Sequence, residues 1–428
     1  MKKLNIAIIG LGNIGSYLFK YLNKNKKILT KKNNCIPVIT YISAKNKKKK
    51  RNIKIKKKQW LDNYLQATKF KDVDLIIELI GGAEGAAKKL VFSALKNKKH
   101  VVTANKALIA KYGDQLSKIA EKNKVNLEFE ASVCGGVPII RSLKEGLIAN
   151  KISKIYGIFN GTSNYILSTM EKENKNFEEV LSNAKKLGYA ESNPSADLNG
   201  EDVAAKLKIL SSLCFNSFLN NNIDVKGIKD IDENDIDNAN KLGYKIKLLG
   251  YAELINNKIY QRVHPTLIKK SSYIAGIDGV LNAVIIDGKP VGQSTIQGEG
   301  AGPSATTSAL ISDISSILRG NIKFPFSIPN KERKKLKFEN ISNRIFSSYM
   351  RLEVLDQQGV LSNITNIFSK NKVSIKRLLQ NPNKNKGTSS IIIVTHKSKD
   401  IFLQKILNQI NKKKYVIKKL KFIRIDDN

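Results

Sequence analysis

Two kinds of hydrophobic pattern alternate along the first third of the chain. Continuous apolar runs, typical of buried parallel strands, occupy residues 4–10, 36–42, 73–80, 100–104 and 125–131. Between them, apolar residues recur at the spacing of amphipathic helices at 14–23, 84–97 and 107–123. Strands that alternate with helices predict an α/β domain with a doubly wound parallel sheet. We expect this domain to span residues 1–136.

The pattern changes after residue 136. Residues 151–167 combine a strand, a glycine turn and a helix, and a further helix is expected over 201–213. Strand-like segments at 259–268 and 281–298 predict that residues 137–302 form an α+β domain. The long helix expected over 303–320 follows a glycine turn, and we expect it to pack back on the first domain.

The last part of the chain has its own order of elements. Residues 321–346 contain prolines and many charges, which predicts a linker. Within 347–428 the pattern predicts strands at 349–356, 373–381, 389–396 and 415–425, with helices at 361–371 and 401–410. This β-α-β-β-α-β order is typical of a ferredoxin-like domain.

Composition agrees with a globular chain. Its 428 residues are 41% hydrophobic and 26% charged, and they include no apolar stretch of about 18 residues that would span a membrane. The apolar run at the N-terminus is too short for a signal peptide and leads into a glycine motif. Cys35, Cys134 and Cys214 are widely spaced and odd in number, which predicts free thiols and a cytoplasmic protein.

The chain carries a large positive charge. Lys and Arg number 75 against 36 Asp and Glu, for a net charge of +39. Such an excess is found in nucleic-acid-binding proteins, but here lysines are spread along the chain without a recognition motif. Lysine, asparagine and isoleucine share A/T-rich codons, so we favour a biased genome as the cause. The densest basic run, 45–58, follows the second predicted strand and suggests a more local use.

A glycine motif follows the first predicted strand and opens a helix. It consists of Gly10, Leu11, Gly12, Asn13, Ile14 and Gly15. In this context the first glycine allows the turn, the second lets a pyrophosphate approach the backbone, and the third lets the helix pack on the strand. The free N–H groups of the helix N-terminus then face the phosphates. The motif predicts a Rossmann-like dinucleotide site.

The end of the second predicted strand bears on the choice of dinucleotide. NAD-binding domains usually have a carboxylate there for the ribose 2′-OH, whereas this chain continues Ser43-Ala44-Lys45. A cationic loop suits a 2′-phosphate, so we predict NADP, with Lys45 as a contact and NAD as the alternative cofactor. The competing interpretation is that these lysines form a solvated loop.

Five segments carry a family resemblance. They are VVTANKAL (101–108), FEASVCGGVPII (129–140), GIFNGTSNYIL (157–167), LGYAESNPSADLNGEDVAAKLKIL (187–210) and EGAGPSATTSA (299–309). In this order behind a dinucleotide motif, they make the chain resemble homoserine dehydrogenase over essentially its full length, and the fourth is the most specific. The resemblance implies interconversion of L-aspartate 4-semialdehyde and L-homoserine, in the biosynthesis of threonine, methionine and isoleucine.

The resemblance implies two catalytic lysines. Lys206 lies four residues after Asp202, so both side chains share one face of the predicted helix. An ammonium group there can stabilise the alkoxide formed by hydride transfer and protonate it. An ordinary helical ion pair is the alternative. Lys106 follows the fourth of the predicted strands, where ligands of open α/β sheets bind, and is a second candidate for proton handling.

The resemblance also implies ligand contacts. Glu191 and Asp202 are implied as carboxylates that bind the amino group of the substrate, and Asp197 as a supporting residue of the same loop. Asn160 and Thr162 lie in a turn that presents donors to the substrate carboxylate. The remaining implied cofactor contacts are Thr103, Lys106, Gly188 and Gly302.

A monovalent cation, usually sodium, accompanies the family. The matching residues are Glu130, Val133, Gly135 and Val137, through one carboxylate and backbone carbonyls. Oxygen ligands suit a hard cation.

The tail resembles an ACT domain, with residues 356–361 at its strand-to-helix turn. This likeness implies L-threonine as an effector, and a homo-oligomer, dimer or tetramer; a dimerisation module without ligand is the alternative.

Three other functions compete. Another Rossmann dehydrogenase would act on a different aldehyde, which a substrate panel would reveal. An NADP-binding, ACT-regulated sensor would lack the catalytic groups, yet Lys106, Glu191, Asp202 and Lys206 are all present. Nucleic-acid binding would give a salt-dependent gel shift.

Overall fold

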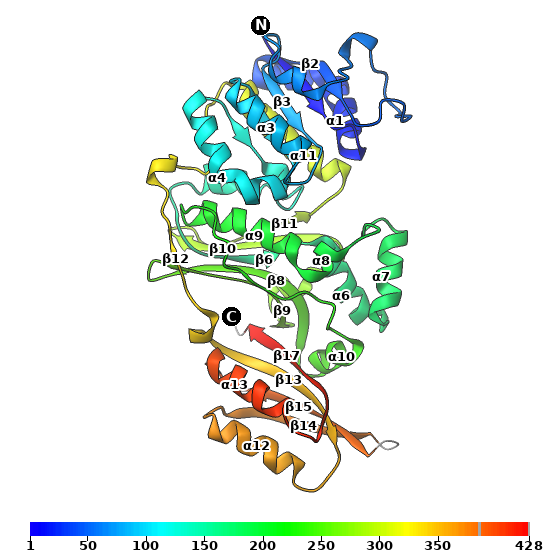
Figure 1. Cartoon of the computed structure of the whole chain (residues 1–428), viewed down its shortest axis with the longest axis vertical. Coiled ribbons are helices and arrows are strands. Elements are labelled where there is room, and N and C mark those ends of the chain that lie inside the picture. The colour runs from blue at the N-terminus through cyan, green and yellow to red at the C-terminus, as the bar shows by residue number, and fades with distance from the viewer. Residues whose placement is uncertain (384–386, 427–428) are drawn as a thin grey trace.

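The structure is a computed structural model that describes residues 1–383 and 387–426. Figure 1 shows an elongated molecule with three regions along its long axis: a parallel sheet with helices, a central sheet covered by helices on one face, and a smaller C-terminal unit. The last two residues of the predicted 347–428 domain, and 384–386 within it, lie outside the described residues.

The N-terminal region contains a five-stranded parallel sheet with strand order β2-β1-β3-β4-β5. The strands are β1 (Lys2–Ile9), β2 (Cys35–Ser43), β3 (Leu75–Glu78), β4 (His100–Thr103) and β5 (Leu127–Glu128). Its helices are α1 (Asn13–Lys24), α2 (Lys26–Asn33), α3 (Ala86–Lys96), α4 (Lys106–Asn123) and, from far along the chain, α11 (Pro303–Leu318). The predicted doubly wound α/β fold is confirmed.

Alternate residues of β1 explain the two helix layers. Ile6 and Ile8 pack with the apolar faces of α1, α2 and α11, whereas Ala7 and Ile9 pack with α3 and α4. Both sets are buried because a parallel strand covered on two faces has no side facing water.

The central region is an antiparallel sheet with order β11-β10-β6-β8-β9. Its strands are β6 (Lys151–Ile158), β8 (Tyr244–Ile255), β9 (Lys258–Lys269), β10 (Leu281–Lys289) and β11 (Gly292–Glu299). The helices of this region are α5 (Ile139–Arg141), α6 (Gly161–Glu173), α7 (Phe177–Lys186), α8 (Ser195–Asn199), α9 (Glu201–Cys214) and α10 (Glu233–Lys241). The α+β architecture was predicted, but the sequence did not reveal β8, α7 or α10.

The C-terminal unit has the predicted β-α-β-β-α-β order. It consists of β13 (Ile345–Leu355), α12 (Val360–Lys370), β14 (Ile375–Asn383), β15 (Thr388–Thr395), α13 (Asp400–Ile410) and β17 (Val416–Asp426). Two-residue strands β7 (Asp224–Val225), β12 (Lys337–Phe338) and β16 (Ser398–Lys399) extend the sheets. The sheet of this unit is continuous with the central one, because β17 pairs with β9 in parallel.

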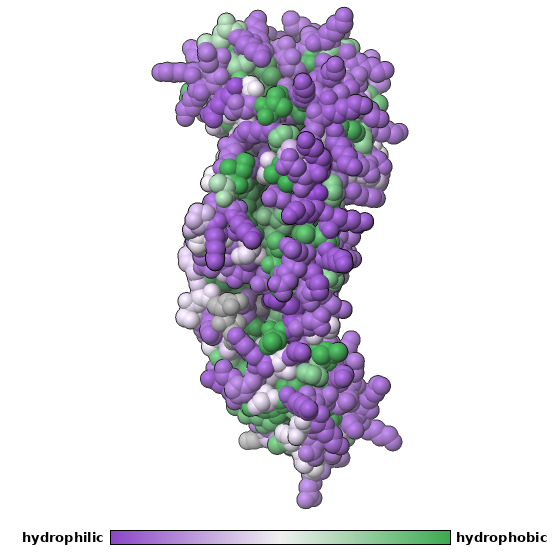
Figure 2. All heavy atoms as spheres, turned by 90° about the vertical axis from the view of Figure 1, so that its left-hand side faces the viewer, coloured by the Kyte–Doolittle hydropathy of each residue, from purple (hydrophilic) through white to green (hydrophobic). Residues whose placement is uncertain are grey.

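The expected linker is packed against the body of the protein. Phe326 is buried, its ring lies 5.4 Å from the ring of Phe129, and the guanidinium of Arg333 lies 4.1 Å from the same Phe326 ring. The three cysteines are buried and free. Within the described residues, no helix has the length and apolarity needed to cross a membrane. Hydrophilic side chains are spread over all three regions of the face in Figure 2.

Candidate active site

The glycine loop is held by close backbone contacts. Gly10 has φ +111°, and a Cβ there would lie 2.4 Å from the Leu79 carbonyl oxygen. A Cβ on Gly15 would lie 2.0 Å from the Gly10 carbonyl oxygen, so the start of α1 packs directly on the turn. A Cβ on Gly12 would meet no atom of the described residues within 4 Å, its own chain neighbours apart. Gly12 therefore opens on space that a ligand can fill.

A cavity of about 310 Å³ lies at this loop. Its lining residues are Leu11, Gly12, Asn13, Ser16, Tyr17, Lys20, Lys49, Lys50, Arg51, Asn52 and Pro303. The start of α11 thus faces the glycine loop at Pro303, next to Gly302, which has φ +104°. The basic run supplies three cations to this cavity, which agrees with a local use of that run for anion binding.

Arg51 ties the basic loop to the glycine loop. Its Nε donates to the Leu11 carbonyl (2.9 Å) and its Nη2 to the Asn46 carbonyl (2.7 Å). Its guanidinium also lies 5.8 Å from the Trp60 ring. The sequence did not single out Arg51; it is the single arginine in a run of lysines. Lys45 is exposed and does not line the cavity, and its contact with the cofactor stays a prediction.

Buried side chains position the start of α4. The Thr103 hydroxyl donates to Glu78 (2.5 Å), and Glu78 also accepts the backbone N–H groups of Ile80 and Gly81. The Asn105 side chain caps α4 by accepting from Leu108 N (3.0 Å) and donates to the Gly82 carbonyl (2.7 Å). Thr103 and Asn105 therefore shape the loops that carry Lys106. Glu78, which the sequence did not indicate, anchors them.

Lys106, Asp202 and Lys206 meet between the first two regions of the chain. Lys106 Nζ, from α4, lies 2.8 Å from Asp202 Oδ1, and Lys206 Nζ, from α9, lies 2.8 Å from Oδ2. Lys206 Nζ also donates to the Phe159 carbonyl (2.6 Å). Lys206 and Asp202 are buried, whereas the Lys106 side chain is 43% exposed. Two of the three donors of Lys206 are used, which leaves one for a substrate oxygen.

The electrostatics keep Asp202 and Lys206 ionised. Burial opposes charge on Asp202, but Lys206 and Lys106 outweigh it and hold the pKa of the carboxyl well below its usual range. Burial likewise opposes charge on Lys206, yet the Asp202 carboxylate raises the pKa of the ammonium above its ordinary value. Lys206 is therefore a protonated, buried acid at neutral pH.

Asn160 links two carboxylates beside this cluster. Its amide donates to Asp197 Oδ1 (2.7 Å) and Asp202 Oδ2 (2.9 Å), while its oxygen caps α6 at Ser163 N (2.7 Å). Burial and the nearby Asp202 charge raise the pKa of Asp197. The Thr162 hydroxyl donates to the Tyr189 carbonyl (2.7 Å), so its proton is engaged within the protein.

Two of the other predicted contacts lie at the surface. Glu191 is exposed and has no ion pair or hydrogen bond within the part of the chain that the structure describes. Gly188 is also exposed, has φ +76° and follows α7. Both roles stay predictions.

Glu130 is buried at the end of the first region. Its two carboxylate oxygens accept the N–H groups of Ile140 (2.9 Å) and Arg141 (2.6 Å), and burial raises its pKa to about 7. The neighbouring loop packs on residues 299–301, since a Cβ on Gly135 would lie 2.6 Å from the Gly300 carbonyl oxygen. The carbonyls of Val133 and Gly135 accept no hydrogen bond among the described residues.

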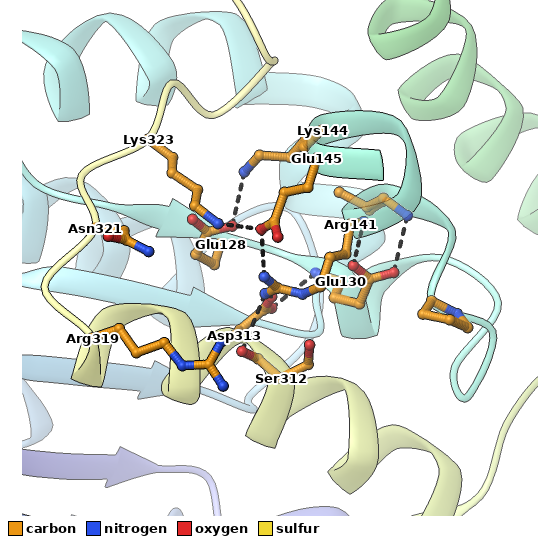
Figure 3. A network of polar contacts seen from close by, with 12 residues as sticks. Glu128, Glu130, Arg141, Lys144, Glu145, Ser312, Asp313, Arg319, Asn321 and Lys323 are labelled. Atoms are coloured by element: carbon orange, nitrogen blue, oxygen red, sulfur yellow. Dashed lines mark hydrogen bonds and ion pairs between the residues drawn. The ribbon is translucent and has the colours of Figure 1, made fainter. Parts of the chain in front are cut away.

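Figure 3 shows the ionic network around Glu130. Arg141 Nη2 lies 3.3 Å from Asp313 of α11, and Asp313 accepts the N–H of Glu130 (2.9 Å). Lys144 forms a buried ion pair with Glu128 (2.8 Å). The network fastens α11 to the segment that leaves the first region. It was not predicted, because its members are far apart in sequence.

The turn between β13 and α12 is exposed over residues 356–359. Gly359 has φ +83° and caps α12, and the Asp356 backbone N–H donates to the Gly387 carbonyl (2.9 Å).

A glycine turn at the head of a parallel sheet, with a buried, ionised lysine across the domain junction, defines a nicotinamide-dependent dehydrogenase with a C-terminal ferredoxin-like unit. Family models agree. The homoserine dehydrogenase family matches residues 138–315, its NAD-binding domain matches 10–130, and an acetohydroxyacid synthase (AHAS) small-subunit-like ACT domain matches 350–418.

Known proteins show the same likeness. Homoserine dehydrogenases of Neisseria gonorrhoeae and Bacillus subtilis are each 36% identical, covering 100% of this chain and 99% of theirs. A crystal structure of a homoserine dehydrogenase from Thiobacillus denitrificans superposes with a TM-score of 0.92, at 34% identity over 100% of this chain and 99% of that one. The chain belongs to the homoserine dehydrogenase family and is an oxidoreductase with an NAD(P)-binding domain.

Proposed function

We propose that this enzyme reduces L-aspartate 4-semialdehyde to L-homoserine with NADPH, reversibly, in the biosynthesis of threonine, methionine and isoleucine. The observation that carries the proposal is the position of Lys206, a buried ammonium held by Asp202 and Phe159 with one donor left, at the junction with the dinucleotide-binding region. Family membership supports the substrate.

Lys206 acts as the acid in this proposal. When bound, the reduced nicotinamide supplies the hydride to the aldehyde carbon. The Lys206 ammonium donates a hydrogen bond to the aldehyde oxygen, stabilises the negative charge that develops there and transfers its proton. Lys106 adds a second positive charge from the opposite side of Asp202. In the reverse direction Lys206 takes the proton from the hydroxyl group.

Asp202 holds the lysines in this arrangement. Its two oxygens already accept Lys106, Lys206 and Asn160, which supports a role as their anchor. Contact of Asp202 with the substrate ammonium, as the family likeness implies, would add to that role. Glu191 and Asp197 are the other carboxylates available to the ammonium, since Glu191 is unpaired among the described residues.

NADP is the cofactor that we propose. Lys49, Lys50 and Arg51 line the cavity at the glycine loop, and Arg51 is already bonded to Leu11. Guanidinium and ammonium groups suit a 2′-phosphate, which NAD lacks.

The first test measures turnover of semialdehyde with NADPH and with NADH. Lys206→Ala should lower kcat about 10²- to 10⁴-fold, as loss of a general acid does. Lys208→Ala on the same helix is the matched control and should keep its rate, because among the described residues the Lys208 ammonium bonds to Asn221 and to no member of the catalytic cluster. We expect kcat/KM at least about tenfold higher with NADPH, the ratio that about 1.4 kcal/mol produces. A Lys206→Ala enzyme with normal kcat would transfer the acid role to Lys106. A wild type that does not turn over the semialdehyde with either NADPH or NADH would refute the function.

We also propose a sodium ion at Glu130, with the carbonyls of Val133, Gly135 and Val137. A buried carboxylate and two carbonyls that accept no hydrogen bond among the described residues, all within residues 130–135, suit a hard monovalent cation. Sodium chloride should raise the thermal midpoint of wild type above that in choline chloride at equal ionic strength. Glu130→Gln should abolish this difference and Glu145→Gln, a surface acid of the same network, should keep it. Equal midpoints in the two salts for wild type would refute the site.

Regulation and assembly complete the proposal. We propose L-threonine as the effector, bound at the turn 356–361, and we propose that the chain forms a homo-oligomer. The match to an ACT-like domain supports the binding of an amino-acid effector.

A further inference from the structure

A cavity of about 460 Å³ separates the central region from the C-terminal unit. One wall is α10. The other is the face of the C-terminal sheet that α12 and α13 leave uncovered, since Leu352 and Val354 of β13 point to those helices and Arg351 and Glu353 point away. All twelve lining residues are polar: Asp232, Asn234, Asp237, Asn238, Lys241, Arg351, Glu353, Asn381, Ser390, Lys418, Lys419 and Lys421.

Arg351 builds the back of this cavity. It is 6% exposed, and its guanidinium binds Asp235 through Nε (2.7 Å), Glu353 through Nη1 (3.1 Å) and Asp232 through Nη2. Asp237 pairs with Lys241 at 2.6 Å. Each acidic side chain that lines the cavity thus has a cationic partner within the protein, and five cationic side chains line the cavity against three acidic ones.

The lysines of β17 are not neutralised. In the strand register, Arg351 of β13 lies opposite Lys421 of β17, and Glu353 lies opposite Lys418. One residue of β13 between these positions therefore faces two residues of β17. The extra residue forms a bulge, and the Leu420 N–H donates to Asn411 instead of to β13 (2.9 Å). A bulge redirects side chains, which explains why Lys418, Lys419 and Lys421 all line one cavity. Lys418 and Lys419 have no ion pair or hydrogen bond within the described residues.

We propose that this interdomain cavity binds a small polar anion, a carboxylate or a phosphate of metabolite size, between Lys418 and Lys419 of β17 and the amides of α10. Its volume falls in the range of small-molecule sites. Unpaired ammonium groups supply the charge, and Asn234, Asn238, Asn381 and Ser390 supply hydrogen bonds. The site is separate from both the catalytic cluster and the turn at 356–361.

The segment before α10 is connected to the catalytic cluster through a short series of contacts. The segment before α10 packs on α8: the Ile228 N–H donates to the Leu198 carbonyl (2.9 Å), and a Cβ on Gly227 would lie 2.0 Å from that oxygen. Leu198 adjoins Asp197, which Asn160 joins to Asp202. A bound anion that draws β17 toward α10 therefore acts on the segment that supports the substrate carboxylates, and it should change KM more than kcat.

The test is calorimetric titration of the full-length protein at about 0.15 M ionic strength, where weak surface attraction is screened. The probes are inorganic phosphate, malonate and L-aspartate. We expect at least one to bind with one site per chain and a Kd below about 1 mM. The double variant Lys418→Gln/Lys419→Gln should weaken that binding at least tenfold. The matched control Lys412→Gln/Lys413→Gln removes the same charge from exposed positions after α13 and should bind as wild type does.

Each outcome of the titration supports or overturns the proposed anion site. Phosphate binding alone identifies a phosphate ester as ligand, and malonate or L-aspartate binding identifies a carboxylate. Absence of binding by all three probes, or equal loss in the control pair, would overturn the site. Thermal unfolding checks that both double variants fold. Because the readout is heat of binding, the result is independent of whether the proposed reaction occurs.

Discussion

Asp202 is the residue through which three regions of the sequence meet. It accepts hydrogen bonds or ion pairs from Lys106 of α4, Lys206 of α9 and Asn160 before α6. Breaking such a buried pair is costly because the remaining charge is left without compensation.

Asp202→Asn should therefore destabilise the protein by about 3–5 kcal/mol at pH 7. In the wild type the raised pKa of Lys206 contributes stability below about pH 10.4, which is lost as pH rises through the folded pKa. The lowered pKa of Asp202 contributes stability above about pH 3.9, and this stability is lost as pH falls through the folded pKa.

In the variant, burial of Lys206 is no longer opposed by this carboxylate, so its pKa falls and the variant should gain stability as pH rises from 7 to 10. Denaturant unfolding at several pH values measures this. Asp237→Asn removes an ion pair of the same i,i+4 spacing at the surface, with Lys241, and should lower the free energy of unfolding by about 0.3–0.5 kcal/mol. A flat profile for Asp202→Asn would contradict the assignment.

At the same scale, the sequence predicted the functional residues that belong to a local motif. Lys206 and Asp202 share a helix face, so their contact follows from spacing. The bonds of Arg51 to Leu11, and of Glu78 to Thr103, join residues that are 40 and 25 positions apart. No local pattern marks either one.

At the scale of elements, the glycine loop shows how one motif serves two purposes. Gly10 and Gly15 are required by contacts within the protein, whereas Gly12 faces open space.

Gly15→Ala should lower both stability and cofactor affinity, because its Cβ would lie 2.0 Å from a backbone oxygen. Gly12→Ala should leave the thermal midpoint nearly unchanged, because its φ of −75° suits alanine, and weaken NADPH binding at least about tenfold. Thermal unfolding and calorimetric titration with NADPH separate these effects. Unchanged affinity in Gly12→Ala would mean that the cofactor does not approach this residue.

The missed strand β8 has a physical explanation. Lys245 and Lys247 interrupt its apolar pattern, yet Lys247 is fully buried and donates to Asn164 (3.0 Å), Asp278 (2.7 Å) and the Ile277 carbonyl (2.6 Å). Lysine is almost never fully buried unless it is paired, and the pairing partners lie on other elements.

At the scale of the whole molecule, two connections unite the regions. β17 adds to the edge of β9, which extends one sheet through both the central region and the C-terminal unit. The segment 321–346 crosses the protein with Phe326 buried among Phe129 and Arg333.

Phe326→Ala should cost about 3–5 kcal/mol, the usual range for a buried phenylalanine. Phe324→Ala is the matched control, since Phe324 is 45% exposed, and it should cost less than about 1 kcal/mol. Chemical denaturation measures both. Equal, small effects would mean that 321–346 acts only as a flexible connection.

By itself, the sequence determined the types of the elements with a regular apolar pattern, the dinucleotide loop and the lysine–aspartate pair of α9, because each depends on periodicity or spacing within a short stretch. The tertiary structure decided which distant groups meet: Lys106 with Asp202, Arg51 with Leu11, β17 with β9, and the bulged lysines with α10. These contacts depend on how helices and strands pack across the domain junctions, and packing of that kind leaves no repeating pattern along the chain.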